Sequence, residues 1–282
     1  SLSCIFSSHI FDKFLIKNED LIKNFIKVNK PDEIYYLAGY HHSSEDLQLD
    51  SYEEFLNSYN INVRYYYNIL DSLRLYSKDT KIFYSSSSHI FGNASNSPQD
   101  ESTPMNPITI YGIHKLAATN ISKFFRRKYN IFASVGILYT HESKYRKINF
   151  LSRKIVTTAI KIKNNKESKL IIGNPNALID WGYAKDYVVA MKKILDYRVP
   201  TDFIISSGRL HKLSDFINYV FNYLNLDYKK YIVVDEIILN RKSICNLYGN
   251  PNKIKSKINW NSSISLKALA EKLVDAELLN IS

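Results

Sequence analysis

The first part of the chain alternates helical stripes of apolar residues with short, unbroken apolar runs. Residues 18–28 carry apolar side chains at helical spacing, with Asn18 as a candidate N-cap, and Pro31 ends the stripe. Residues 32–39 (DEIYYLAG) then run without a break into a glycine, which predicts a buried strand followed by a turn. A helix, a short turn and a buried strand in this order are typical of a parallel sheet with crossover helices.

The same alternation continues to about residue 140. A long helix is predicted over residues 50–76, with an interruption near Asn60, and a strand over Lys81–Ser87. A helix over residues 109–129 and a strand over residues 131–140 follow. Three alternations of strand and helix predict an α/β fold built on a doubly wound, Rossmann-like parallel sheet.

Beyond residue 141 the pattern changes to shorter, mixed elements. Helices are predicted over residues 149–163, 185–197, 213–224 and 265–279, and strands over residues 169–172, 202–206 and 231–234. We therefore predict a Rossmann-like domain over residues 1–140 and a smaller C-terminal α/β region, residues 141–282, that mainly binds substrate. Strands between residues 170 and 206 are candidates to return to the first sheet.

The strand over Lys81–Ser87 leads into the stretch with the clearest chemistry. Four serines, Ser85 to Ser88, end the strand, and a loop with three prolines leads to a helix that carries Tyr111 and Lys115 one turn apart. A tyrosine that acts as a base near pH 7 needs its pKa lowered by about 3 units, roughly 4 kcal/mol, and a lysine one turn away supplies positive charge for this. A serine hydroxyl such as that of Ser87 can hold the reacting oxygen in place.

These three side chains predict a site that moves a hydride and a proton together. A second interpretation has the same spacing: Tyr111 packs in the core, Lys115 is solvated, and the serines are ordinary loop residues.

Composition narrows the classes of partner. The formal charge is +11, but the lysines are scattered and form no basic helix, so the charge favours an anionic small substrate over nucleic acid.

No apolar run approaches the roughly 20 residues that span a bilayer, and residues 1–13 lack the features of a secretory leader. Cys4 and Cys245 are too few for a disulfide framework or a zinc cage, which favours the cytoplasm. His41 and His42 have no paired carboxylate at helical spacing, so no metal site is predicted.

Short blocks of sequence spread between residues 31 and 260 resemble one family. They are PDEIYYLA (31–38), SSSHIFG (86–92), YGIHK (111–115), GILYTHES (136–143), RKI (153–155) and DWGYAKDYV (180–188), together with Asn62-Val63, Asn68 and Leu70. The chain is similar to the extended short-chain dehydrogenase/reductases that act on nucleotide sugars, and most closely to the GDP-mannose 4,6-dehydratase family.

The resemblance implies NAD as the cofactor and a nucleotide sugar, with GDP favoured, as the substrate. It places Leu37, Ala38 and Gly39 on the adenosine side of NAD, Ser85 and Ser86 beside the nicotinamide ribose, and Tyr111 and Lys115 at the reacting end. It implies substrate contacts for Thr140, His141, Glu142, Asn149, Arg153, Lys154 and Arg241, and arginine forks suit phosphate oxygens. It also implies a homodimer or homotetramer, with the helices over residues 50–76 and 111–129 pairing across a twofold axis.

One family feature has no counterpart in the 282 residues. Only eight glycines occur, and no two are placed to build G-x-G-x-x-G or a P-loop. We expect the glycine-rich loop, and with it the residue that selects NAD or NADP, in a first βαβ unit that precedes residue 1.

Departures from the family pattern bear on the reaction. A 4,6-dehydratase oxidises carbon 4, removes water across carbons 5 and 6 and returns the hydride, and the middle step uses a carboxylate at the position of His89 or Ser88. Neither residue here is acidic. We therefore expect oxidation at carbon 4 of GDP-mannose or GDP-manno-heptose, in the synthesis of surface polysaccharide sugars, without dehydration. Ile179, Thr140 and the pair Tyr65-Tyr66 also differ from the family's Arg, Asn and Gly-Thr.

Three alternatives stay open at this point. His89 replaces the acid in a full 4,6-dehydratase, the enzyme is a nucleotide-sugar 4-epimerase, or the chain is a non-catalytic subunit that binds nucleotide sugars. The residues leave the base and the sugar of the substrate open.

Overall fold

The computed structural model describes residues 16–41, 51–239 and 247–281. Its longer elements are α2 (Glu19–Asn29), β1 (Glu33–Tyr36), α3 (Tyr52–Tyr59), α4 (Tyr65–Tyr76), β2 (Lys81–Ser87), α5 (Ile110–Tyr129), β3 (Ala133–Leu138), α6 (Leu151–Lys163), α7 (Ala184–Asp196), β8 (Asp202–Ile205), α8 (Leu213–Tyr223), α10 (Asn252–Ile258) and α11 (Leu266–Ile281). Short strands are β4 (His141–Glu142), β5 (Leu170–Ile172), β6 (Leu178–Asp180), β7 (Gly182–Tyr183), β9 (Leu210–Lys212) and β10 (Ile232–Val234). The described residues also form the π-helical turn Asn60–Arg64, the 3-10 turns Ser88–Phe91 and Tyr228–Lys230, and α9 (Glu236–Leu239).

The centre of the fold is a four-stranded sheet in the order β1-β2-β3-β8, in which every neighbouring pair is parallel. This confirms the predicted α/β fold with a parallel sheet. The last strand, β8, comes from the second half of the chain and pairs with β3, so the sheet takes a strand from beyond residue 141. All four carboxyl ends therefore lie at one edge, where ligands of such sheets bind.

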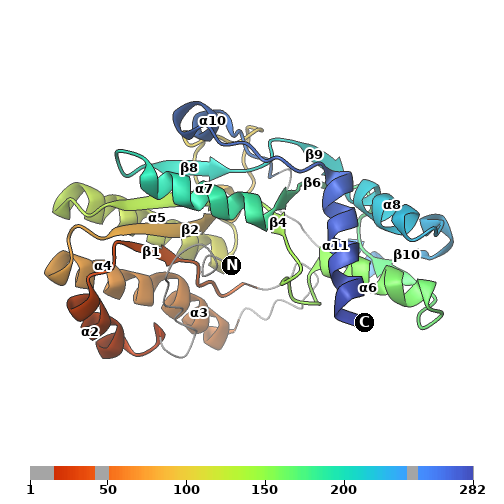
Figure 1. The fold of residues 1–282 in the computed structure, drawn as a ribbon, viewed down its shortest axis with the longest axis horizontal. Helices are drawn as coiled ribbons and strands as arrows, with labels where there is room; N and C mark the ends of the chain where they lie inside the picture. The colour runs from red at the N-terminus through yellow and green to blue at the C-terminus, as the bar shows by residue number, and fades with distance from the viewer. Residues whose placement is uncertain (1–15, 42–50, 240–246, 282) are drawn as a thin grey trace.

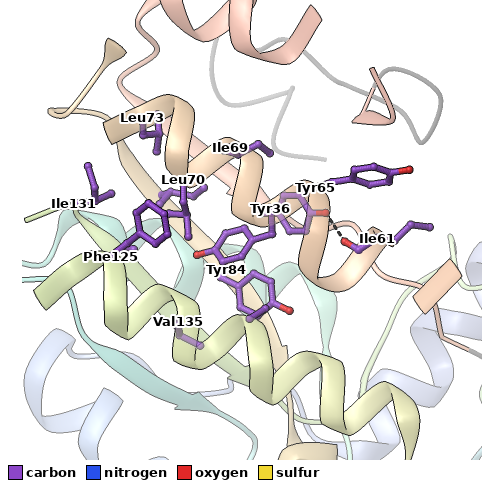
Figure 2. Close-up of a cluster of buried hydrophobic side chains, with 14 of the residues drawn as sticks. Tyr36, Ile61, Tyr65, Ile69, Leu70, Leu73, Tyr84, Phe125, Ile131 and Val135 are labelled. Atoms are coloured by element: carbon purple, nitrogen blue, oxygen red, sulfur yellow. Dashed lines mark hydrogen bonds between the residues drawn. The ribbon is translucent and has the colours of Figure 1, made fainter. Parts of the chain in front are cut away.

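Alternate residues of the strands face two separate apolar layers. Tyr36, Tyr84 and Val135 lie in register on one face and pack against α4 and α5 in the cluster shown in Figure 2. Phe83 and Phe203 point to the other face, where side chains of α7 cover them. Helices on both faces make the sheet doubly wound, and burial on both sides explains the unbroken apolar runs of its strands.

A second apolar cluster forms in the C-terminal region. Helices α6, α8 and α11 pack around it together with β5 and Trp181, apart from the four-stranded sheet (Figure 1). The small pairs β5–β10, β4–β7 and β6–β9 belong to this half of the chain. The division into domains at residue 140 stays a prediction.

Local signals explain several element boundaries. The Asn18 side chain accepts a hydrogen bond from Leu21 N at 3.0 Å, as expected of an N-cap. The interruption expected near Asn60 is a π-helical turn between α3 and α4. The sequence patterns missed β4, β6, β7 and β9, because these short strands lack the unbroken apolar run that marks β5 and β10. No helix in the described part of the chain has both the length and the apolar character needed to cross a bilayer.

Candidate active site

The site lies at the carboxyl edge of the sheet, where the segments after β1, β2 and β3 meet. Helix α5 brings Tyr111 and Lys115 to this edge. Thr109 caps the helix by accepting a hydrogen bond from Gly112 N at 3.1 Å. A Cβ atom at Gly112 would lie 2.7 Å from the carbonyl oxygen of His89, so glycine lets the start of α5 pack directly on the turn that follows β2.

Lys115 is buried, with 2% of its surface exposed, rather than solvated. Its Nζ donates a hydrogen bond to the carbonyl oxygen of Ser85 at 2.8 Å. Burial lowers the pKa of Lys115 from 10.5 to about 7, because the ammonium loses its hydration and gains no carboxylate in return. The interpretation in which Lys115 is solvated is therefore wrong.

Tyr111 is half-buried beside Lys115, whose Nζ lies 5.7 Å from the centre of the tyrosine ring. Burial raises the pKa of Tyr111 to about 12, while a hydrogen bond with Ser87 and the charge of Arg146 oppose the rise. From the sequence we expect Lys115 to depress this pKa. Burial leaves the Lys115 amine only partly protonated near pH 7, so it supplies only part of the positive charge that the phenolate needs.

The four serines that end β2 have different surroundings. Ser85 Oγ donates to the carbonyl oxygen of Tyr36 at 3.0 Å, and Ser86 Oγ shares a hydrogen bond with Thr119 on α5 at 2.8 Å. Ser87 Oγ accepts a hydrogen bond from His89 N at 3.3 Å and is the serine that bonds to Tyr111. The geometry therefore brings together Ser87, Tyr111 and Lys115, as the sequence predicts, while Ser85 and Ser86 use their hydroxyls within the protein.

His89 and His41 both pack against Tyr111. The His89 ring meets the tyrosine edge-on, with ring centres 5.5 Å apart, and the His41 ring lies 4.4 Å from it. Burial lowers the pKa of His89 to about 4, so its imidazole is neutral near pH 7. Sequence reasoning considered His41 only as a metal ligand and missed this position, since nothing local links it to Tyr111.

Beyond β1, Gly39 lies close to the polar ends of Lys115 and Asn62. A Cβ atom built at Gly39 would be 3.7 Å from Lys115 Nζ and 3.8 Å from Asn62 Oδ1. Asn62 Oδ1 is a buried acceptor that has no hydrogen-bond partner within the described ranges. Leu37 is exposed, and Ala38 and Gly39 are half-buried, at this carboxyl end of β1.

The residues expected to contact substrate fall into two groups. Thr140, His141 and Glu142 continue β3 at the same edge of the sheet, and Thr140 accepts a hydrogen bond from Gly182 N at 2.8 Å. His141 stacks on Tyr187 at 4.7 Å, and burial lowers its pKa to about 4. Glu142 is buried, accepts a hydrogen bond from Ser152 Oγ at 2.6 Å and lies 3.4 Å from Arg146 Nε.

The second group lies on or just before α6. Arg153 donates to the carbonyl oxygen of Arg146 at 2.7 Å and pairs with Glu277 of α11 at 3.1 Å, so its guanidinium joins two helices. Asn149 is exposed and Lys154 is half-buried. Arg241 lies outside the described residues. Arg146 is the cation that sequence reasoning missed, and it stacks over Phe150 at 4.0 Å, next to His41.

In the three ranges that the structure describes, no group of His, Cys, Asp and Glu side chains could hold a metal ion.

Comparison with known proteins decides the family. A family model described as GDP-mannose 4,6 dehydratase matches residues 7–273. The chain belongs to this family. Among curated members of the GDP-mannose 4,6-dehydratase family, GDP-mannose 4,6 dehydratase 2 of Arabidopsis thaliana is 32% identical over 261 residues, which are 91% of this chain and 68% of the relative. The human GDP-mannose 4,6 dehydratase is 31% identical over 88% of this chain and 71% of its own length. The resemblance seen in the sequence is confirmed.

Solved structures of low identity share the fold. RMD from Pseudomonas aeruginosa, complexed with NADPH, superposes with a TM-score of 0.83 at 18% identity, over 95% of this chain and 87% of its own. A dTDP-glucose 4,6-dehydratase from Bacillus anthracis, in complex with NAD, has a TM-score of 0.79 at 19% identity, over 94% and 78%. The doubly wound, Rossmann-like fold predicted for this chain is confirmed.

Proposed function

We propose that this protein is an NAD-dependent oxidoreductase that acts on carbon 4 of a nucleotide sugar, with GDP-mannose and GDP-manno-heptose as the favoured substrates. The placement of Tyr111 beside both Ser87 and Lys115 at the carboxyl edge of the sheet is the observation that supports it. Membership of the GDP-mannose 4,6-dehydratase family supports a nucleotide sugar as the substrate. The proposal includes a role in the synthesis of surface polysaccharide sugars and a cytoplasmic location.

The residues present fit the reacting half of NAD. Lys115 Nζ uses one donor on Ser85, and Asn62 Oδ1 is an unpaired buried acceptor, so the pair offers donors and an acceptor of the kind that ribose hydroxyls need. NAD bound there would supply the acceptor for the hydride of carbon 4 and a positive charge next to the site.

In this proposal Ser87 and Tyr111 handle the proton. The Ser87 hydroxyl holds the carbon 4 oxygen, and Tyr111 in its phenolate form accepts the proton of the carbon 4 hydroxyl. Burial disfavours the phenolate, so Tyr111 works as a base only while positive charge from Arg146, a protonated Lys115 and the bound cofactor offsets that burial.

The surroundings of Tyr111 support oxidation without dehydration. The groups that shift its pKa are Ser87 and Arg146, and neither is a carboxylate. His89 occupies the position where the dehydratase pattern has its acid, and its imidazole is neutral near pH 7. The second candidate is a 4,6-dehydratase in which His89 does the work of that acid, and it is favoured by the 5.5 Å contact of its ring with Tyr111. A 4-epimerase uses the same three residues, whereas a non-catalytic subunit has no need of them.

The test is to incubate the full-length protein with NAD and either GDP-mannose or GDP-manno-heptose. Products are identified by mass spectrometry and NMR, and NADH is followed by absorbance. We expect NADH and a 4-keto sugar that has kept all its oxygen atoms. A product that has lost one water from the sugar would contradict this proposal and support the 4,6-dehydratase instead. Full activity in the Tyr111→Phe variant would contradict both the oxidoreductase and the dehydratase proposals.

We also propose that the protein forms a homodimer through α3, α4 and α5. These helices carry exposed apolar side chains, namely Phe55, Tyr59, Tyr67, Ile113 and Phe124. A second copy that presents the same surface would cover them, as a twofold axis requires. A tetramer built from two such dimers is compatible with this arrangement.

A further inference from the structure

A chain of hydrogen bonds joins helix α5, through α3, to the π-helical turn that carries Asn62. His114 Nδ1 and Ser58 Oγ lie 2.8 Å apart, and Asn62 Nδ2 donates to the same Ser58 oxygen at 3.1 Å. All three residues are buried, with at most 4% of their surface exposed. The proposed function uses Asn62 but gives His114 and Ser58 no part.

Two aromatic rings of α3 enclose His114. Phe55 and Tyr59 meet the imidazole edge-on, with ring centres 5.0 Å and 5.9 Å away. Burial lowers the pKa of His114, so its ring is mainly neutral near pH 7. A neutral imidazole has one nitrogen that donates a hydrogen bond and one that accepts. Because Ser58 Oγ already accepts from Asn62, the hydrogen of this hydroxyl suits an accepting Nδ1.

The amide of Asn62 has one orientation that suits its partners. Its Nδ2 donates to Ser58 Oγ and, at 3.4 Å, to the carbonyl oxygen of Tyr40. Its Oδ1 is therefore turned the other way, to the side of Gly39 and Lys115 Nζ, where it has no hydrogen-bond partner among the described residues. The reversed amide would set Oδ1 against the Tyr40 carbonyl oxygen, and two acceptors form no hydrogen bond.

Ser58 and His114 together hold this orientation. The bond to Tyr40 is long, so the Ser58 oxygen contributes more. A hydroxyl can rotate, and a Ser58 hydrogen pointed at Asn62 would favour the reversed amide. An accepting His114 Nδ1 takes that hydrogen and leaves an oxygen lone pair for Asn62 Nδ2.

We propose that His114 is a positioning residue that acts through Ser58 to keep Asn62 Oδ1 available as an acceptor for a ribose hydroxyl of the cofactor. This inference rests on the proposed function, in which Asn62 and Lys115 serve the ribose of the reacting half of NAD.

The first test needs no cofactor. Nitrogen-15 NMR of the full-length protein with labelled histidine distinguishes the two tautomers of a neutral ring, and His114→Phe identifies the signals of His114. We expect the ring hydrogen on Nε2, with Nδ1 accepting. In Ser58→Ala the Nδ1 signal should shift, because its donor is gone. A ring hydrogen on Nδ1 would overturn the proposal.

The second test measures NAD binding by calorimetry. We expect His114→Phe and Ser58→Ala each to weaken NAD binding about tenfold, since reversal of the amide removes a buried acceptor. Phenylalanine keeps a ring beneath α3 and removes the nitrogens. The double variant should lose about tenfold as well, because both changes act through Asn62. His211→Phe, on β9, is the matched control and should bind NAD like the wild type.

Binding of ADP separates positioning from a general loss of structure. ADP lacks the nicotinamide ribose, so both variants should bind it as the wild type does. Ser58→Thr, which keeps the hydroxyl, should bind NAD like the wild type. Unchanged NAD binding in His114→Phe and Ser58→Ala, or ADP binding weakened as much as NAD binding, would overturn the proposal. If His114→Phe does not fold, Ser58→Ala decides.

A wild-type protein that binds no NAD would instead overturn the proposed function. The tautomer of His114 would still decide whether the chain of hydrogen bonds runs as described.

Discussion

At the scale of single residues, Lys115 shows how burial changes a side chain that the sequence can identify. Its pKa is lowered to about 7, so between about pH 7 and pH 10 the unfolded chain binds more protons than the folded one. Stability therefore rises with pH in this window. We expect the free energy of unfolding of the wild type, relative to that of Lys115→Met, to rise by about 1 kcal/mol per pH unit there.

Urea denaturation at several pH values across that window measures this slope. Lys257→Met is the matched control, because the Lys257 side chain is exposed to solvent in the folded protein as it is in the unfolded chain. An equal slope for the wild type and Lys115→Met would mean that the ammonium stays solvated in the folded protein.

The residue His89 allows a second prediction, which concerns the reaction. His89→Glu places a carboxylate against Tyr111, at the position where the dehydratase pattern has its acid. A positioned acid–base group contributes about 100-fold to 10,000-fold, so the variant should form a product that has lost one water, which the wild type does not form. Mass spectrometry of the sugar nucleotide checks this, with His89→Gln as the neutral control of the same size. The dehydrated product in His89→Gln as well would show that the carboxylate is not the cause.

At the scale of elements, α4 is held to the sheet by a stack of tyrosines. Tyr66 is fully buried, and the centre of its ring lies 4.3 Å from that of Tyr84 and 5.1 Å from that of Tyr36. Its hydroxyl shares a 2.7 Å hydrogen bond with Ser122 of α5. Figure 2 shows Tyr36 and Tyr84 beneath α4, with the bond from Tyr36 to the carbonyl of Ile61 dashed. This stack ties α4, α5 and two strands together directly beneath the site.

We expect Tyr66→Phe to lower the free energy of unfolding by about 1 kcal/mol, the worth of its hydrogen bond. Tyr66→Ala should cost about 3–5 kcal/mol, because it also leaves a cavity. Urea unfolding of both variants gives the two values. Tyr52→Phe, at a position 76% exposed, is the control and should change nothing measurable. Similar losses in Tyr66→Phe and Tyr66→Ala would show that packing contributes little.

At the scale of the whole molecule, the apolar surface on α3, α4 and α5 leads to a prediction about assembly. Ile113 and Phe124 lie on α5 within this surface. We expect the double variant Ile113→Glu, Phe124→Glu to weaken dimerisation by about 100-fold or more, since buried carboxylates without partners are costly. Sedimentation velocity over a range of concentrations measures the change.

The control for this prediction is Ile237→Glu on α9, which is 76% exposed and outside the surface. It should dimerise like the wild type. A monomeric wild type, or a double variant that dimerises normally, would contradict the proposed assembly.

The sequence by itself determined the order of the four strands of the central sheet, the helices between them and three residues of the site. The strands β1, β2, β3 and β8 appear as apolar runs because both faces of the sheet are covered, and Asn18 marks a helix start because its side chain caps a local amide. Ser87, Tyr111 and Lys115 could be assigned because a strand end and one helical turn set their relative places.

Only the tertiary structure decided what surrounds those three residues. The contact of His41 with Tyr111 joins segments 70 residues apart. The pairing of Arg153 with Glu277 spans 124 residues, and it engages a guanidinium that the sequence led us to expect at a phosphate. The pKa of Lys115 and that of Tyr111 likewise depend on how much water the packed chain leaves. Periodicity and spacing report local geometry, whereas contacts across the sequence and the loss of solvent arise only when the sheet and its helices assemble.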